Sequence, residues 1–130
     1  MSRSRILVVN DDGWNGSGLH PLIEALSRLG RVCVVVPERE RSAESHCLTL
    51  HKPLRASRHP SMEKDNIKVY STNGTPSDSV MLGLLEIAQD TDVLFSGING
   101  GPNMGEDVLY SGTAAAAMEG ALLGVRSIAI

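Results

Sequence analysis

Three short, uninterrupted apolar runs constrain the fold of this chain more than any other feature. They cover residues 6–9, 32–36 and 93–95, and no charged or amide side chain interrupts them. A strand with one wet face alternates apolar and polar residues, whereas a continuous apolar strand is buried on both faces. Such strands occur in parallel sheets covered by helices. The runs therefore predict a buried parallel sheet at the centre of the molecule.

Helical patterns separate these runs. In the first, apolar residues recur at steps of three and four, the stripe of an amphipathic helix: Leu19, Leu22, Ile23, Leu26 and Leu29. We expect Ser17 to cap this helix and Gly30 to end it. A second helix is predicted from Thr75 to about Gln89, because Thr-Pro-Ser-Asp places a cap, an N1 proline and an N3 acid in order.

The remaining segments complete the predicted order. An alanine-rich helix is expected over 111–124, opening at position 111 or 112, with strands at 67–70 and 125–130 and a brief strand at 48–50. Residues 55–66 are interpreted as a loop. Strands that alternate with helices predict the α/β class, a mostly parallel sheet with helices on both faces, and 130 residues fit a single domain over 1–130.

Composition excludes several classes of function. The net charge is −3, and residues 73–130 hold seven acids and one base, so we expect no nucleic-acid polymer as partner. No apolar run approaches the roughly 20 residues of a membrane span, and two cysteines are too few for a disulfide scaffold. We therefore expect a cytoplasmic protein with no membrane partner. Cys33, inside a predicted buried strand, is expected to be unreactive.

Two adjacent carboxylates, Asp11 and Asp12, follow the first apolar run. In doubly wound sheets ligands bind at the carboxyl ends of the strands. A hard divalent cation such as Mg²⁺ would relieve the repulsion between the two carboxylates. The alternative is a solvated Asp-Asp-Gly turn with one Asp capping the next helix. The position after the first buried strand favours the metal.

The glycine-rich segment after the third apolar run is the second candidate site. Asn99 and Asn103 offer amide oxygens to a metal and amide N–H groups to phosphate. Ser111, Gly112 and Thr113 open the predicted helix with free backbone N–H groups and two hydroxyls, which suits a phosphate. The alternative is a glycine-rich loop with Ser111 as an ordinary cap. No Gly-Lys-Ser/Thr follows the glycines, so this is not a nucleotide P-loop.

Taken in order, four blocks of sequence make the chain similar to the survival protein SurE family. They are residues 9–13 (VNDDG), 37–42 (PERERS), 74–78 (GTPSD) and 96–105 (SGINGGPNMG) leading into 110–113 (YSGT) and 117–120 (AMEG). The resemblance implies a Rossmann-like three-layer α/β/α fold and a 5′/3′-nucleotidase linked to stationary-phase survival. Such an enzyme hydrolyses nucleoside monophosphates with one divalent metal ion, Mg²⁺ or Mn²⁺.

The resemblance also assigns roles to individual residues. It implies a metal held by Asp11, Asp12, Ser42 and Asn99, and a phosphate held by Asn103, Ser111, Gly112 and Thr113. It further implies a homo-oligomer, a dimer or tetramer, built through later segments. Because the chain ends on a predicted strand, we expect an N-terminal portion of a longer family fold, without the family's C-terminal segments.

The expected chemistry is attack of a metal-activated water on a phosphomonoester, with Asp11 or Asp12 orienting the water or accepting its proton. Two alternative functions stay open, together with a third possibility, an unstable fragment that needs its missing part or a partner to cover a strand edge. An aspartyl-phosphate phosphotransferase would use an Asp as covalent nucleophile, although that class places its carboxylates two apart. A nucleotide-binding fragment without turnover would keep the site and lack the reaction.

Overall fold

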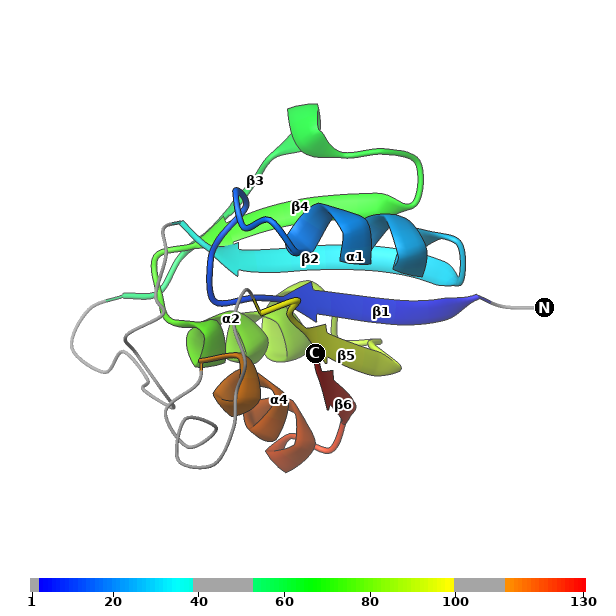
Figure 1. The fold of residues 1–130 in the computed structure, drawn as a ribbon. Coiled ribbons are helices and arrows are strands. Elements are labelled where there is room, and N and C mark those ends of the chain that lie inside the picture. The colour runs from blue at the N-terminus through cyan, green and yellow to red at the C-terminus, as the bar shows by residue number, and fades with distance from the viewer. Residues whose placement is uncertain (1–2, 39–52, 100–111) are drawn as a thin grey trace.

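The computed structural model describes residues 3–38, 53–99 and 112–130, and these residues form a six-stranded sheet (Figure 1). The strand order is β3-β4-β2-β1-β5-β6. The strands are β1 (Ser4–Val9), β2 (Gly30–Pro37), β3 (Ala56–Arg58), β4 (Ile67–Thr72), β5 (Val93–Ser96) and β6 (Arg126–Ala129). Only β3, against β4, pairs antiparallel among the pairs described. The predicted mostly parallel α/β fold is confirmed.

Helices cover both faces of the sheet (Figure 1). Helix α1 (Leu19–Ser27) packs on one face, and α2 (Pro76–Leu82) and α4 (Gly112–Leu122) pack on the other. A 3₁₀ turn η1 (Pro60–Met62) follows β3, and a π-helical turn η2 (Gly83–Ile87) continues α2. Within the described ranges, no helix has the length and apolar character needed to cross a bilayer.

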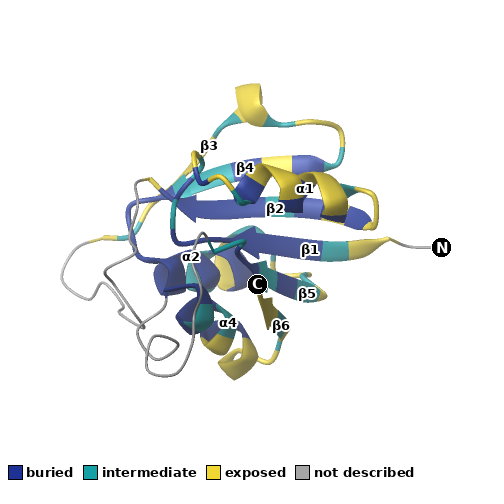
Figure 2. Cartoon of the chain, viewed as in Figure 1, coloured by how far each residue is buried: buried dark blue, intermediate teal, exposed yellow. Residues whose placement is uncertain are grey.

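Burial of the central strands on both faces explains the apolar runs. Leu7 and Val8 are neighbours in β1 whose side chains point to opposite faces, and both are 0% exposed. Val8 joins the core under α1, while Leu7 joins the core under α2 and α4. Figure 2 shows the same contrast, with β1 and β2 buried along most of their length and the outer side of α1 exposed.

The ends of α1 differ from the prediction. Gly18, not Ser17, is the N-cap residue, and no side chain caps the helix. A Cβ on Gly18 would lie 2.5 Å from the Ile98 carbonyl oxygen, so this position must be glycine for the loop to pack against the segment after β5. Helix α1 ends at Ser27, and Gly30 begins β2 beside Ser4 of β1. The expected cap at Ser17 and helix end at Gly30 were wrong, because tertiary contacts set both ends.

The interpretation of 55–66 as a loop was wrong in part. All three residues of β3 are exposed, so the strand has no hydrophobic pattern that sequence analysis could detect. It forms through backbone pairing with β4, extended by the hydrogen bond from His59 N to Val69 O at 2.9 Å. An ion pair of 2.8 Å between Arg58 and Glu63 braces the turn that follows. The predicted strand at 48–50 lies outside the described residues.

The predicted start of the second helix is confirmed in atomic detail. Thr75 Oγ1 accepts a hydrogen bond from Asp78 N at 3.2 Å, and Asp78 Oδ2 accepts one from Thr75 N at 2.8 Å. This capping box satisfies two N–H groups at the start of α2. The α-helix ends at Leu82, earlier than predicted, and becomes the π turn at Gly83. A Cβ on Gly83 would lie 2.8 Å from Leu7 Cδ2, so the helix lies very close to the sheet there.

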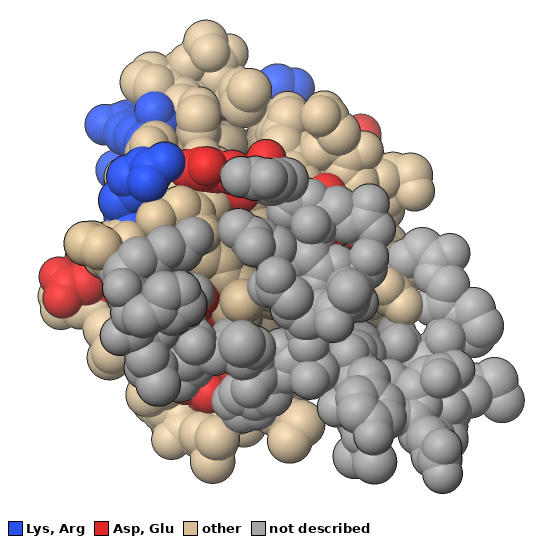
Figure 3. Space-filling model, turned by 90° about the vertical axis from the view of Figure 1, so that its left-hand side faces the viewer, with Lys and Arg blue, Asp and Glu red and all other residues tan. Residues whose placement is uncertain are grey.

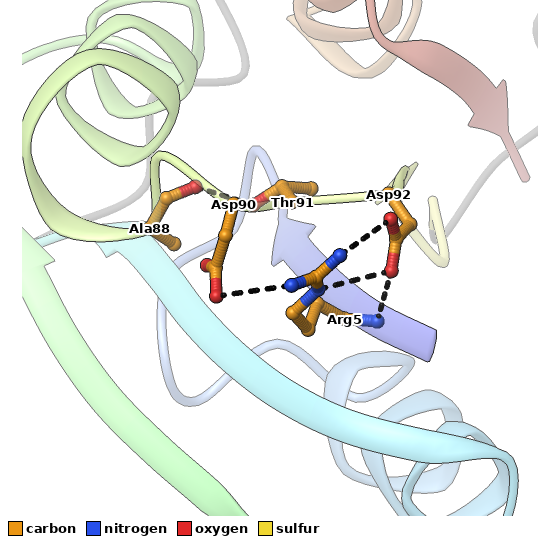
Figure 4. Close-up of polar contacts among 5 residues, drawn as sticks. All are labelled: Arg5, Ala88, Asp90, Thr91 and Asp92. Carbon is orange, nitrogen blue, oxygen red and sulfur yellow. Dashed lines mark hydrogen bonds and ion pairs between the residues drawn. The ribbon is translucent and has the colours of Figure 1, made fainter. Parts of the chain in front are cut away.

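An ionic network lies at the amino ends of β1 and β5, opposite the carboxyl ends of the strands (Figure 4). Asp92 Oδ2 accepts hydrogen bonds from Arg5 N at 2.8 Å and Arg5 Nε at 3.2 Å, and Asp90 lies 3.6 Å from the same guanidinium. Hydrogen bonds from Arg5 lower the pKa of the Asp92 carboxyl. The network ties the turn before β5 to the start of β1, away from the strand ends where ligands are expected.

Candidate functional site

The carboxyl ends of β1 and β5 lie side by side, because Val9 pairs with Ser96. The loop after β1 folds back on itself through Asn10, whose amide donates to Gly13 O at 2.7 Å and accepts from Gly13 N at 3.0 Å. This turn holds Asp11 and Asp12 at the strand end. Asp11 is buried, at 5% exposure, while Asp12 is partly exposed. One carboxylate is thus oriented into the protein and its neighbour stands at the surface.

Asn99 lies on the loop after β5, and Ile98 of this loop lies against Gly18 of the loop after β1. Gly97 N donates to Val9 O at 3.0 Å, and Asn99 N donates to Ile130 O at 2.9 Å. Gly97 has φ of +145°, and a Cβ there would lie 2.5 Å from Ile130 O, so only glycine fits between β1 and the end of β6. The Gly97–Ile98 peptide bond is cis. Three of the four predicted metal ligands therefore lie on two touching loops.

Three buried hydroxyls on this side of the sheet have no hydrogen-bond partner within the described part of the chain. They are Ser77 in the first turn of α2, Ser96 at the end of β5 and Thr113 at the start of α4. Each is at most 1% exposed. By contrast, the buried Thr72 hydroxyl lies 2.9 Å from Ser79 Oγ. Buried polar groups are normally paired, so these three hydroxyls, which lack partners among the described residues, are candidate donors to a polar ligand.

Of the predicted phosphate-binding residues, the structure places Gly112 and Thr113. Both are buried in the first turn of α4, which packs beside α2. A helix start carries unpaired N–H groups and the positive end of the helix dipole. Ser42, Asn103 and Ser111 lie outside the described residues, and their roles stay predictions.

The donor set suits a hard cation. Among the residues described, no group of three His, Cys, Asp or Glu side chains comes together. The candidate ligands are instead two carboxylates and an amide oxygen, the oxygen donors that Mg²⁺ and Mn²⁺ take, with water completing the shell. On the face at the carboxyl ends of the strands, acidic side chains lie near the centre and Lys and Arg side chains gather to one side (Figure 3).

Two residues escaped the sequence analysis. Ser96 directly follows the apolar run of 93–95, so its position alone could have singled it out. Trp14, two residues after Asp12, lines a cavity of about 420 Å³ beside the β1 loop. A second cavity, of about 410 Å³, lies near the amino ends of the strands, and Cys33 is one of the residues that line it. Burial raises the pKa of the Cys33 thiol to about 12, which agrees with the predicted lack of reactivity.

The fold and the polar loops at the carboxyl ends of its strands define a class of protein. A mostly parallel open sheet, with polar loop residues at the carboxyl ends of adjacent strands and a helix start beside them, is an α/β domain that binds its ligand at that edge. The model of the family described as Survival protein SurE matches residues 6–130. The chain therefore belongs to the SurE family.

Relatives and a solved structure agree with this assignment. The chain is 48% identical over 132 residues to the 5′-nucleotidase SurE of Caldanaerobacter subterraneus subsp. tengcongensis. This match covers 100% of the chain and 51% of the relative. It is 52% identical over 128 residues to the 5′-nucleotidase SurE of Gloeobacter violaceus, covering 97% and 49%. The crystal structure of the SurE protein from Aquifex aeolicus matches with a TM-score of 0.84 and 45% identity, over 96% of this chain and 49% of that one. The chain spans about half the length of these relatives.

Proposed function

We propose that this chain carries the site of a metal-dependent phosphomonoesterase that hydrolyses nucleoside 5′- and 3′-monophosphates to nucleoside and phosphate. The observation that carries the proposal is a set of buried hydroxyls, without partners among the described residues, on the side of the sheet where Asp11 and Asp12 follow β1. The names of the relatives, 5′-nucleotidase SurE, support the same activity. A homo-oligomeric state and a cytoplasmic location remain predictions that accompany this function.

Asp11, Asp12 and Asn99 would hold the metal, with Ser42 as the fourth predicted ligand. The donor chemistry fits Mg²⁺ or Mn²⁺, as described above. When bound, such an ion neutralises charge on phosphoryl oxygens and lowers the pKa of a coordinated water. The chain's own contribution is rigidity, because the Asn10–Gly13 hydrogen bonds fix the loop that carries both carboxylates. One of these carboxylates accepts the proton of the attacking water.

The phosphoryl group would lie against the start of α4. Thr113 Oγ1 and the first N–H groups of the helix donate to its oxygens, with Asn103 and Ser111 as further predicted donors. Thr113 and the first turn of α4 are held in place by the fold before substrate arrives, so they stabilise charge that develops on the phosphoryl oxygens. Water forms the new P–O bond, the ester P–O bond breaks, and the leaving oxygen takes up the proton.

A phosphate-release assay over nucleoside monophosphates tests the proposal, with Mg²⁺ or Mn²⁺ and with EDTA. We expect release only with metal, and loss of release in Asp11→Asn and in Asp12→Asn with unchanged circular dichroism. Metal-dependent turnover in both variants would refute the assignment. Nucleotide binding without release would indicate the binding-only alternative, and a trapped phosphoenzyme would indicate the phosphotransferase.

A further inference from the structure

The described residues that line the cavity beside the β1 loop come from four parts of the chain. Trp14 and Asn15 come from the loop after Asp12, Glu38 follows β2, His59 and Met62 belong to the β3–η1 segment, and Ser71 belongs to β4. Its volume of about 420 Å³ lies in the range of small-molecule pockets, roughly 300–1,000 Å³. The cavity can therefore hold a group the size of a nucleoside.

Trp14 is held firmly at this cavity. The His20 ring donates from Nε2 to the Trp14 carbonyl oxygen at 2.9 Å, and the two rings meet edge to face with centroids 4.5 Å apart at 82°. Trp14 also packs against the core under α1. An aromatic ring that is already ordered loses little conformational entropy when a planar ligand stacks on it. Trp14 is the only tryptophan in the chain.

The rest of the wall combines one apolar surface with hydrogen-bonding groups. Met62 is 40% exposed although methionine is usually buried, and its thioether is a soft partner for an aromatic ring. His59 Nε2 and Ser71 Oγ share a hydrogen bond of 2.7 Å. The Glu38 carboxylate, 3.2 Å from Arg55, is available as an acceptor. An indole, a thioether and polar groups around one cavity match a planar ring with hydrogen-bonding edges.

The position of the cavity connects it to the candidate site. Trp14 follows Asp12 by two residues, so their Cα atoms are at most about 7 Å apart. In a nucleoside monophosphate a ribose separates the base from the phosphate. A ligand with its phosphate near the carboxylates can therefore extend its base toward Trp14.

We propose that this cavity binds the base of a nucleoside monophosphate, with Trp14 and Met62 as its apolar walls. The inference rests on the proposed nucleotidase function and adds a base-recognition site to it. Base stacking on an aromatic side chain strengthens binding by about 5- to 150-fold. A purine, with the larger ring surface, is expected to bind more tightly than a pyrimidine.

Fluorescence of the single tryptophan tests the inference separately from catalysis. We expect adenosine, which has no phosphate, to quench Trp14 in a saturable way, and inorganic phosphate to leave it unchanged. Met62→Ala should weaken adenosine binding by about 2- to 12-fold, the range expected for a contact between a thioether and an aromatic ring. Met118→Ala is the matched control, since Met118 is 54% exposed on α4 and does not line the cavity.

Turnover gives a second readout. In Trp14→Ala, the ratio of kcat/KM for AMP to kcat/KM for ribose 5-phosphate should fall about 10-fold, and in Met118→Ala it should not change. An unchanged ratio, or no quenching by adenosine in an active protein, would overturn the base site and leave the nucleotidase proposal intact. Quenching by adenosine without any phosphate release would refute the nucleotidase proposal and support the base site.

Discussion

Replacing Thr113 by valine separates a ligand-binding role from a structural one. Thr113 is 1% exposed and its hydroxyl has no partner among the described residues, while valine keeps the branched shape. Burying an unpaired hydroxyl costs about 1–3 kcal/mol. Thr113→Val removes that cost, so we expect the free energy of unfolding to stay the same or to rise by about 1 kcal/mol. If the hydroxyl donates to a phosphate, the lost bond is worth about 1.5–3 kcal/mol, or about 10- to 150-fold in kcat/KM.

Thr72→Val is the matched control for this substitution. Thr72 is 0% exposed, but its hydroxyl lies 2.9 Å from Ser79 Oγ and 3.4 Å from Gly74 N. Valine there removes both hydrogen bonds and leaves the buried Gly74 N–H without this acceptor, while Ser79 Oγ keeps its bond to Thr75 O at 3.1 Å, so unfolding should become easier by about 1–2 kcal/mol. The two Thr→Val changes should therefore move stability in different directions, although the chemical change is the same.

Urea unfolding at equilibrium measures both stability changes, and phosphate release measures kcat/KM for a nucleoside monophosphate. The reasoning fails if Thr113→Val lowers stability as much as Thr72→Val, because the Thr113 hydroxyl would then be paired within the fold. It also fails if Thr113→Val hydrolyses substrate at the wild-type rate.

Three further predictions concern pH, thiol chemistry and metal. Hydrogen bonds from Arg58 and from Val69 N lower the pKa of Glu63 from its ordinary 4.5 to about 2. The stability that Glu63 contributes is therefore complete above pH 4.5 and is lost as the pH falls toward 2, so acid titrations of wild type and Glu63→Gln should converge over that window. In a Cys47→Ser background at pH 8, iodoacetamide should modify native Cys33 on the order of a thousandfold more slowly than in urea, because its pKa of about 12 leaves roughly one thiolate in ten thousand, against roughly one in four for an unfolded cysteine; equal rates would contradict this. Saturating Mg²⁺ or Mn²⁺ should raise Tm, since a ligand of the folded state stabilises it, and a Tm that EDTA does not reverse would argue against the metal site.

Local chemistry made much of the fold predictable. Residues close together in the sequence predict both the buried strands and the Thr75–Asp78 capping box, and the structure confirms both. The end of the sheet where we expect the site followed from topology, because parallel strands bring their carboxyl ends together. Strand β3 could not be predicted, since its residues are all exposed and only pairing with β4 makes them a strand. The start of α1 could not be predicted either, because Gly18 packs against the backbone of Ile98, which is far away in the sequence.

Pattern alone established an α/β chain with apolar strands and put Asp11 and Asp12 at a strand end, because periodicity and turn chemistry depend on near neighbours. Packing between segments about fifty residues apart or more decided which hydroxyls are buried without a partner in the described part of the chain. It also decided that Trp14 shares a cavity with Met62. Such contacts leave no mark in local sequence, since many distant partners could satisfy the same residue. Tertiary structure therefore decided where the cavity lies and which buried hydroxyls are candidate donors to a ligand.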